Sequence, residues 1–409
     1  MDIRISPSTL HGHLDIPASK SCAHRAIIAA ALADGTSVIT GVTMSKDITA
    51  TIEAMSALGS HFTVDGSTVT VRGISSVPTG KCSIDCNESG STLRFVIPVA
   101  AVLGAESEFI GRGRLPHRPI DIYTRELSKN GVTFLTTAMP YNITGRLTGG
   151  RFEIEGDVSS QFITGLLFAL PLAKEDSEIV LTSHLESRPY VDITTDMLRG
   201  FGIEITETEN GFFIPGGQKY RPHDCRVEGD YSQAAFFFVA NAIGSDVEIG
   251  NLNKKSVQGD KKILEIIEKV CYNNTIKGFS ADCSDIPDLV PILTVLAAYG
   301  SEKSVIFNAK RLKIKESDRL ESAAALINSL GGNVSVTDDG LIIQPTGKLH
   351  GGVVDSYGDH RIVMAAAVAA LGCDGDVVIK GAEAAEKSYP DFFTDYSDLG
   401  GKVNVINLE

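Results

Sequence analysis

The sequence predicts an α/β protein composed of two similar domains, and three observations lead to this prediction. The chain has 409 residues, which is more than one ordinary hydrophobic core accommodates. One pattern recurs along it: an alanine-rich apolar helix, a strand, a polar loop with a base and an acid, a second helix, a stop that contains glycine, and another strand. A polar stretch at residues 218–226, typical of a linker or hinge, separates the first three copies from the last three.

The first three copies share a short apolar strand, a base with a nearby acid, and a glycine that ends the second helix. In the first copy these are residues 37–39, 46–47 and 58–59, followed by a hairpin at 62–71 that turns at an Asp-Gly pair. In the second they are residues 108–110, 118–121 and 130–131, and in the third 178–181, 188–192 and 201–202, with a last strand at 212–214.

The last three copies repeat the same order. The fourth has residues 247–249, 259–260 and a degenerate stop near 270–271; the fifth has 305–307, 313–319 and 331–332, with a hairpin turn at 339–340; the sixth has 377–379, 387–391 and 400–401. Because the base and the acid open the second helix of each copy, we expect several helix N-termini to meet at a cleft between the domains. Unpaired N–H groups there favour anions.

Residues 313–319 hold five charged side chains within seven residues, directly ahead of an amphipathic helix. The helix stripe consists of Leu320, Ala323, Ala324, Ile327 and Leu330, and two glycines follow it. The charges are therefore predicted to lie on the first turn, with Ser317 and Asp318 as cap and first-turn acid. Lys315 and Arg319, four residues apart, should share one face. Taken alone, an ordinary capped surface helix would have the same pattern.

Four other stretches place polar residues directly ahead of an apolar helix. They are residues 17–25, 87–94, 159–162 and 357–361. Ser21 could cap the first helix, and Gly90 lets backbone N–H groups approach a ligand in the second. His360 beside Asp359 could form an acid–base pair. A capped helix, a plain turn or a hydrogen-bonded structural histidine would explain each stretch alone, and residues 285–288 add two carboxylates of open purpose.

Composition excludes several classes of function. The chain is 43% hydrophobic and 22% charged with a net charge of −14, which argues against a nucleic-acid-binding surface. No apolar run reaches the roughly 18 residues of a membrane span, and the start alternates like a strand rather than a signal peptide, so we expect a cytoplasmic protein. The seven cysteines lack metal-ligand spacing and are expected to be reduced packing residues.

As an ordered set, these stretches resemble the enolpyruvyl transferase family, in the branch whose acceptor is shikimate 3-phosphate. The matching stretches are residues 19–25, 89–94, 118–120, 159–162, 187–192, 285–288, 315–319 and 359–361, and Lys387 with residues 390–391. The resemblance implies two inverted α/β domains, each of three βαβαββ repeat units, with the active site in the interdomain cleft. It assigns residues 1–17 and 227–409 to one domain and residues 18–226 to an inserted domain.

The resemblance also implies the reaction. The 5-hydroxyl of shikimate 3-phosphate attacks C2 of phosphoenolpyruvate, a tetrahedral ketal phosphate forms, and phosphate leaves. This is a step of the shikimate pathway to chorismate and the aromatic amino acids. We expect these two small molecules as partners, neither metal nor organic cofactor, no nucleic acid or membrane, and a monomer.

Carried over residue by residue, the resemblance assigns two binding sets and three catalytic groups. Shikimate 3-phosphate would be bound by Lys20, Ser21, Arg25, Ser159, Ser160, Gln161, Ser187, Asp288 and Lys315. Phosphoenolpyruvate would be bound by Lys20, Gly90, Arg118, Gln161, Arg319, Arg361 and Lys387. Asp288 would handle the 5-hydroxyl proton, Glu316 the proton at the methylene carbon, and Lys20 would serve both substrates. Asp318 is better interpreted as a structural acid of its helix.

The sequence departs from the family pattern at three positions. Ala18 stands where many relatives have glycine, Glu88 where asparagine is commoner, and Arg311 where some relatives use asparagine for the shikimate ring, so that this last role is not carried over. Gly90 leaves room for glyphosate in sensitive relatives. We therefore expect inhibition of this protein by glyphosate, and a millimolar Ki would contradict that expectation.

Three alternatives remain at this stage. A UDP-N-acetylglucosamine enolpyruvyl transferase would share the fold, but it usually carries a cysteine in the loop corresponding to residues 111–118, which has none here. A non-catalytic anion-binding protein would not need both Asp288 and Glu316. A relative of RNA 3′-phosphate cyclase would not fit the net charge. The resemblance further leads us to expect that the unliganded cleft opens about the crossovers near Pro17 and Arg226.

Overall fold

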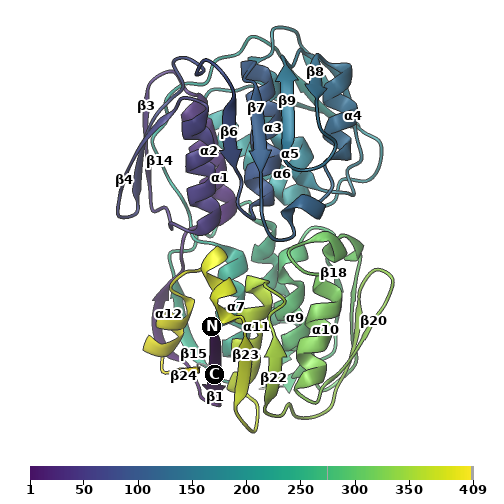
Figure 1. The fold of residues 1–409 in the computed structure, drawn as a ribbon. Coiled ribbons are helices and arrows are strands. Elements are labelled where there is room, and N and C mark those ends of the chain that lie inside the picture. The colour runs from purple at the N-terminus through teal and green to yellow at the C-terminus, as the bar shows by residue number, and fades with distance from the viewer. Residues whose placement is uncertain (274, 407–409) are drawn as a thin grey trace. The chain divides into compact units, whose positions relative to one another are not determined.

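The computed structural model describes residues 1–273 and 275–406. The chain forms two compact units: Ala18–Glu228, called here the inserted unit, and Met1–Pro17 with Gly229–Glu409, called the terminal unit. Each unit has its own core of buried aliphatic and aromatic side chains. In Figure 1 the inserted unit runs from purple to teal, and the terminal unit joins the first, dark purple strands to the green and yellow part of the chain.

The inserted unit contains three four-stranded sheets of one topology, in the orders β14-β3-β5-β4, β6-β7-β9-β8 and β10-β11-β13-β12. In each sheet the first two strands are parallel and the later pairs are antiparallel. The strands are β3 (Thr36–Thr40), β4 (His61–Asp65), β5 (Thr68–Arg72), β6 (Cys82–Asp85), β7 (Ser107–Ile110), β8 (Val132–Phe134), β9 (Tyr141–Gly145), β10 (Gly150–Ile154), β11 (Ser177–Leu181), β12 (Thr206–Thr208), β13 (Gly211–Ile214) and β14 (Cys225–Arg226).

Each of these sheets is accompanied by an inner and an outer helix. The inner helices are α1 (Lys20–Leu32), α3 (Gly90–Leu103) and α5 (Ser160–Ala169), and the outer ones are α2 (Lys46–Ala57), α4 (Asp121–Lys129) and α6 (Arg188–Gly200). The 3-10 helices are η1 (Leu115–His117) and η2 (Leu170–Leu172). The inner helices are buried over most of their length because they are apolar on all sides, whereas α4 buries one stripe.

The terminal unit repeats this topology in the sheets β18-β19-β21-β20 and β22-β23-β1-β24, and it adds the parallel pair β2–β15 and the small antiparallel pair β16–β17. Its strands are β1 (Asp2–Ser6), β2 (His11–Asp15), β15 (Asp246–Gly250), β16 (Cys271–Tyr272), β17 (Thr275–Ile276), β18 (Ser280–Asp282), β19 (Ser304–Phe307), β20 (Asn333–Val336), β21 (Leu341–Gln344), β22 (Gly352–Asp355), β23 (Val377–Lys380) and β24 (Lys402–Ile406). Strand β1 pairs with both β23 and β24, so the first residues of the chain complete the last repeat (Figure 1).

The helices of the terminal unit alternate in the same way. The inner helices are α7 (Tyr231–Ala242), α9 (Val290–Ala298) and α11 (His360–Leu371), and the outer ones are α8 (Lys262–Val270), α10 (Arg319–Ser329) and α12 (Phe392–Asp398). The 3-10 helices are η3 (Gly259–Lys261), η4 (Pro287–Leu289), η5 (Lys310–Ile314) and η6 (Ala382–Lys387). Every residue of α9 and α11 is buried, whereas α8 buries only Ile263 and Val270.

The predicted repeats are confirmed by the glycines that end the outer helices. Gly59, Gly131, Gly202, Gly331 and Gly400 all have φ values between +79° and +107°, a conformation that suits glycine because it has no Cβ. The fourth copy, whose stop was predicted to be degenerate, ends α8 at an extended Cys271 instead. The predicted α/β class with two domains is therefore confirmed. Within the described residues, every helix is too short or too polar to cross a membrane.

Two predicted helix starts are wrong. Helix α10 begins at Arg319, not among residues 313–317, because Asp318 accepts hydrogen bonds from Leu320 N at 3.2 Å and Glu321 N at 3.3 Å and so acts as the N-cap. Lys315 therefore lies outside the helix and does not share a face of it with Arg319. Helix α1 begins at Lys20 with Ser19 as its cap, so Ser21 is not the cap.

Candidate active site

Arg319 is the centre of a cluster of charged side chains in the terminal unit. Its guanidinium is almost fully buried and contacts three carboxylates: Nη1 lies 2.8 Å from Asp288 Oδ1, Nη2 lies 2.7 Å from Glu316 Oε2, and Nε lies 2.8 Å from Asp359 Oδ2. These acids come from η4, from the loop ahead of α10 and from the cap of α11. The fold thus brings together charged groups that are far apart in the sequence.

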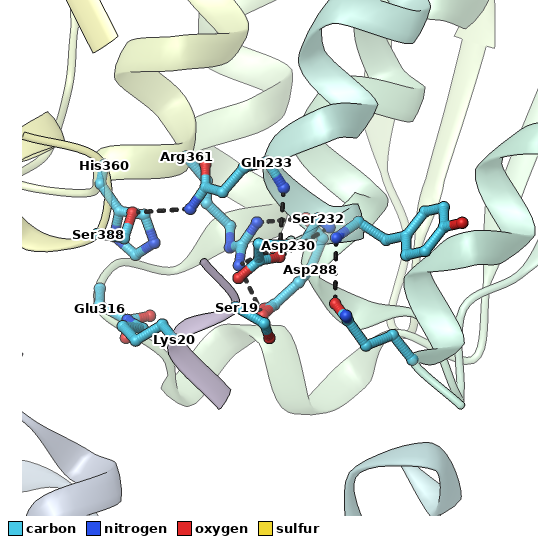
Figure 2. A network of polar contacts seen from close by, with 12 residues as sticks. Ser19, Lys20, Asp230, Ser232, Gln233, Asp288, Glu316, His360, Arg361 and Ser388 are labelled. Carbon is cyan, nitrogen blue, oxygen red and sulfur yellow. Dashed lines mark hydrogen bonds and ion pairs between the residues drawn. The ribbon is translucent and has the colours of Figure 1, made fainter. Parts of the chain in front are cut away.

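A second arginine, Arg361, holds the other side of Asp288. Its Nη2 lies 2.8 Å from Asp288 Oδ2 and 3.0 Å from Ser232 Oγ, and the Ser232 hydroxyl donates in turn to Asp230 Oδ1 at 2.5 Å (Figure 2). Asp359 fixes the start of α11, because its Oδ1 accepts the backbone N–H of Arg361, and the contacts with Asp288 and Ser232 hold the side chain of Arg361. Both arginines are therefore fixed in place by helix caps and carboxylates.

The electrostatics of this cluster are dominated by burial and by opposite charges. Burial alone would raise the pKa of Asp288, but Arg361, Arg319 and Lys315 outweigh it and hold that pKa far below its usual range. Burial lowers the pKa of Lys315 to about 8, against the attraction of Asp288. The three carboxylates raise the pKa of Arg319 well above its usual range despite burial, so that it stays charged.

Two further residues named from the sequence, Lys387 and His360, belong to the terminal unit. Lys387 is the last residue of η6 and is buried. The Nδ1 atom of His360 lies 3.8 Å from Asp359 Oδ1, which is too long for a hydrogen bond. The two side chains therefore adjoin without a hydrogen bond between them, because Asp359 makes its short bonds to Arg319, to Ser317 Oγ at 3.0 Å and to the α11 backbone.

In the inserted unit, the start of α1 presents Lys20 and buries Arg25. Lys20 Nζ lies 3.0 Å from Asp47 Oδ2, the acid of the first repeat. The Arg25 guanidinium donates to Thr194 Oγ1 at 2.8 Å and to the carbonyl oxygens of Ser21 at 2.7 Å and Tyr190 at 2.9 Å, and burial lowers its pKa to about 10. Arg25 therefore links α1 to α6, which restricts how far it can reach toward a ligand.

The start of α3 lies against the guanidinium of Arg118. Ser89 is the N-cap of this helix, and Gly90 is its first residue. A Cβ atom on Gly90 would lie 2.2 Å from Arg118 Nη1, closer than unbonded atoms approach. Glycine at this position is therefore explained by the close approach of Arg118, which is itself largely buried.

The start of α5 holds a hydrogen-bonded glutamine. Ser159 caps the helix by accepting the Gln161 N–H. The Gln161 side chain accepts from Arg94 Nη1 at 2.7 Å and donates to Ser91 Oγ at 3.0 Å. Ser160 is the first helical residue and is buried. At the start of α6, Ser187 is buried with φ at +56°, so its backbone adopts a conformation uncommon for serine.

The three departures from the family pattern have local explanations. Ala18 does not have a positive φ, and it donates its N–H to Thr43 Oγ1. The backbone at this position therefore does not require glycine. The side chain of Glu88 packs against the 111–118 loop, since a Cβ on Gly113 would lie 2.7 Å from Glu88 Cδ. Arg311 is buried and donates to the carbonyl oxygen of Ser284. It therefore has a contact within the protein.

Several residues that contact the candidate site residues of the two units were not assigned from the sequence. Asp359 and Arg94 lay in matching stretches, and Asp47 was recognised as the acid of a repeat, so the signal for all three was present. Ser232, at the start of α7, contacts Arg361 without any motif that could have indicated it.

Comparisons with known proteins extend over almost the whole chain. Residues 5–396 match the family model described as EPSP synthase (3-phosphoshikimate 1-carboxyvinyltransferase). A 3-phosphoshikimate 1-carboxyvinyltransferase of Clostridium novyi is 43% identical, with 98% of each chain covered, and one of Clostridium acetobutylicum is 44% identical, with 99% of each covered. The solved structure of EPSP synthase from Acinetobacter baumannii is similar with a TM-score of 0.84 at 26% identity, over 99% of this chain and 100% of that one.

Proposed function

The chain belongs to the EPSP synthase (3-phosphoshikimate 1-carboxyvinyltransferase) family, and from this premise we propose how its residues carry out the transfer. The reaction joins the enolpyruvyl group of phosphoenolpyruvate to the 5-hydroxyl of shikimate 3-phosphate and releases phosphate, a step of the shikimate pathway. The observation that carries the proposal is the Arg319 cluster, in which two buried arginines and two titratable acids, Asp288 and Glu316, adjoin one another.

We assign phosphoenolpyruvate to five cations, one glycine and one glutamine. The set consists of Lys20, Gly90, Arg118, Gln161, Arg319, Arg361 and Lys387. Planar guanidiniums bind carboxylates and phosphates through paired hydrogen bonds, and carboxylates hold Arg319 and Arg361 in fixed directions. The anionic substrate would take over part of these contacts, so the arginines need little reorganisation on binding.

Shikimate 3-phosphate is assigned to the helix starts that carry hydroxyls and basic groups. This set consists of Lys20, Ser21, Arg25, Ser159, Ser160, Gln161, Ser187, Asp288 and Lys315. Lys315 and Lys20 would neutralise the phosphate, and the hydroxyls suit the ring oxygens. Arg25 would act chiefly by holding α1 to α6, because its three nitrogens already contact protein oxygens.

Asp288 is proposed to take the proton of the 5-hydroxyl. With both arginines on it, this carboxylate is a weak base, because its pKa is far below the usual range. Phosphoenolpyruvate bound to Arg319 and Arg361 would offset their positive charge with its own negative charge, and the pKa of Asp288 would rise. Binding of the second substrate would therefore create the base at the time when it is needed.

Glu316 is proposed to deliver a proton to the methylene carbon and to remove one in the elimination step. It shares Arg319 with Asp288, so the two acids are coupled through one guanidinium. A carboxyl group exchanges a proton with carbon only if its pKa rises toward neutrality. The same transfer of charge from Arg319 to the substrate would act in that direction.

Lys315 gives a pH prediction. Its pKa is lowered to about 8 by burial, with Arg319 and Arg311 acting in the same direction and Asp288 and Glu316 opposing them. As the pH rises through that value, the ammonium loses its proton, and kcat/KM for shikimate 3-phosphate should fall. Profiles from about pH 6 to 10 should show this limb, and the Lys315→Arg variant, which stays charged, should lose it. An identical limb in the variant would contradict the assignment.

Gly90 gives a steric prediction. In the Gly90→Ala variant the new Cβ would collide with Arg118 Nη1, 2.2 Å away, so the guanidinium must move. We expect KM for phosphoenolpyruvate to rise about tenfold or more, with KM for shikimate 3-phosphate changed by less than about threefold. Gly375→Ala is the control for a glycine replacement as such, because Gly375 has no positive φ and an added Cβ would meet only Gly351, at ordinary contact distances of 3.4 and 3.5 Å.

The function itself is tested by phosphate release from phosphoenolpyruvate with either of two acceptors. Release with shikimate 3-phosphate and none with UDP-N-acetylglucosamine would support the proposal, and the reverse would refute it. We further propose that the protein acts as a monomer in the cytoplasm. Sedimentation of a single species of monomer mass, with and without both substrates, tests the first part.

A further inference from the structure

A buried chain of hydrogen bonds connects His24 to the N-cap of α3, and the roles proposed above do not use it. His24 Nδ1 lies 2.7 Å from Thr51 Oγ1, which lies 2.7 Å from Thr92 Oγ1, and Thr92 Oγ1 lies 2.8 Å from Ser89 Oγ. All four side chains are at most 1% exposed. The chain thus connects α1, α2 and α3 inside the core of the inserted unit.

The direction of the chain follows from counting protons. The Thr92 hydroxyl donates to Ser89 Oγ, so its single proton is used there. Thr92 Oγ1 must then accept from Thr51, and the Thr51 proton is used in turn. The bond between Thr51 and His24 therefore requires a proton on His24 Nδ1. Thr51 Oγ1 also lies 3.3 Å from the Asp47 carbonyl oxygen, which can only accept and so draws on the same Thr51 proton. No proton of Thr51 is left for His24, which specifies the tautomer of the histidine.

The environment of His24 keeps it neutral. Burial lowers its pKa to about 3, since the attraction of Asp47 is weaker and Lys20 and Arg25 act in the same direction as burial. The edge-on ring of Phe95, with its centroid 6.3 Å away, packs against it. An Nδ1 proton is present in this neutral tautomer and in the cation alike, so the donor persists at every pH at which the enzyme would work.

The other end of the chain is at the proposed phosphoenolpyruvate site. Ser89 Oγ also accepts the Thr92 N–H at 3.2 Å and so caps α3, and Gly90 follows it directly. The guanidinium of Arg118 occupies the space beside Gly90 that a Cβ would fill, at 2.2 Å from Nη1, so a shift of the helix start changes the space that is left for the guanidinium. The position of Ser89 therefore determines the position of two residues assigned to that substrate.

We propose that His24 is a positioning residue that acts through Thr51 and Thr92 to hold Ser89, and with it the start of α3, against Arg118. The inference rests on the proposed function, because Gly90 and Arg118 are assigned there to phosphoenolpyruvate. His24 touches neither substrate in this scheme. Its loss should weaken the binding of phosphoenolpyruvate selectively and leave the binding of shikimate 3-phosphate intact.

Three substitutions at one position separate positioning from packing. His24→Leu removes the donor and keeps an apolar side chain, His24→Asn places an amide donor as many bonds from the backbone as Nδ1, and His24→Gln places it one bond further out. We expect His24→Leu and His24→Gln to raise KM for phosphoenolpyruvate about tenfold, and His24→Asn to stay within about threefold of the wild type. KM for shikimate 3-phosphate should change by less than about twofold in all three.

The control is Ile28→Ala, which changes a buried residue of α1 that takes no part in these hydrogen bonds. It should lower the melting temperature and leave both KM values unchanged. If His24→Leu and His24→Asn had the same KM for phosphoenolpyruvate, or if both substrates were affected equally, the positioning role would be refuted.

The tautomer of His24 is tested by nitrogen-15 NMR of the wild type, in which the His24 signal is the one that is lost in His24→Asn. We expect the proton on Nδ1. A proton on Nε2 would refute the proposed direction of the hydrogen bonds. Because the NMR readout does not depend on turnover, it separates this failure from failure of the proposed function, which would appear as a wild type that releases no phosphate.

Discussion

The Glu316→Gln variant should lose turnover while keeping its substrates. We expect kcat to fall about a thousandfold, which is the usual effect of removing a general acid or base. Both KM values should stay within about threefold of the wild type. Glutamine has nearly the same shape and can still accept the hydrogen bond that Arg319 Nη2 donates to Glu316 Oε2 at 2.7 Å. It cannot carry the proton that the methylene carbon must gain and lose.

A proton-exchange measurement makes this prediction specific. In deuterated water, the wild type should incorporate deuterium into the methylene group of phosphoenolpyruvate, and the variant should not, because protonation of that carbon is the step removed. Glu321→Gln, an exposed acid in the first turn of α10, is the matched control and should retain full activity. Unchanged turnover in Glu316→Gln would leave residues 313–319 with a purely structural role, as the loop that leads into a capped helix.

Local patterns predicted the elements of the fold well, since period and stop signals are contained in neighbouring residues. The stripe from Leu320 to Leu330 is buried as expected, and Gly331 ends the helix region with φ at +80°. The choice between Ser317 and Asp318 as cap could not be made in this way. The Ser317 hydroxyl instead contacts Asp359 Oδ2, a partner 42 residues further along the chain, so a long-range contact decided a local question.

Pairings between distant segments were beyond the local pattern. Ile3 lies opposite Ile379 and Val405 in the register of β1, and only the family resemblance indicated that the first residues join the last repeat. The same holds for the site. The sequence identified Asp288, Glu316 and Arg319 as candidate site residues. That the guanidinium of Arg319 contacts Asp288, Glu316 and Asp359 together is a result of tertiary packing and could not be predicted.

Removing the charge of Arg319 should destabilise the terminal unit strongly. In Arg319→Met the buried Asp359 loses its Nε donor, and Asp288 and Glu316 lose one guanidinium that they share. Leaving a buried charge uncompensated costs about 3–5 kcal/mol, and we expect a loss of this size together with loss of activity. Arg199→Met, which breaks an exposed pair with Asp196, should change stability by less than about 0.5 kcal/mol.

The pH dependence and a second substitution identify electrostatics as the cause. In the wild type the pKa of Asp288 is depressed in the folded state, so its stabilising contribution is present above the unfolded pKa of about 4 and is lost as the pH falls. In Arg319→Met the folded-state pKa of Asp288 rises because one of the cations that lower it is gone, so the destabilisation should be largest near neutral pH and should shrink as this acid protonates. Asp359→Asn, which is neutral but can still cap α11, should recover part of the lost stability when it is combined with Arg319→Met.

Urea unfolding at two pH values measures both effects. The values are roughly pH 7.5, well above the range in which carboxyl groups titrate, and roughly pH 5, near that range. Because each unit has its own core, the transition of the inserted unit should stay unchanged and serves as an internal reference. Equal destabilisation at both pH values, without recovery in the double variant, would show that Arg319 stabilises the unit by packing rather than by charge.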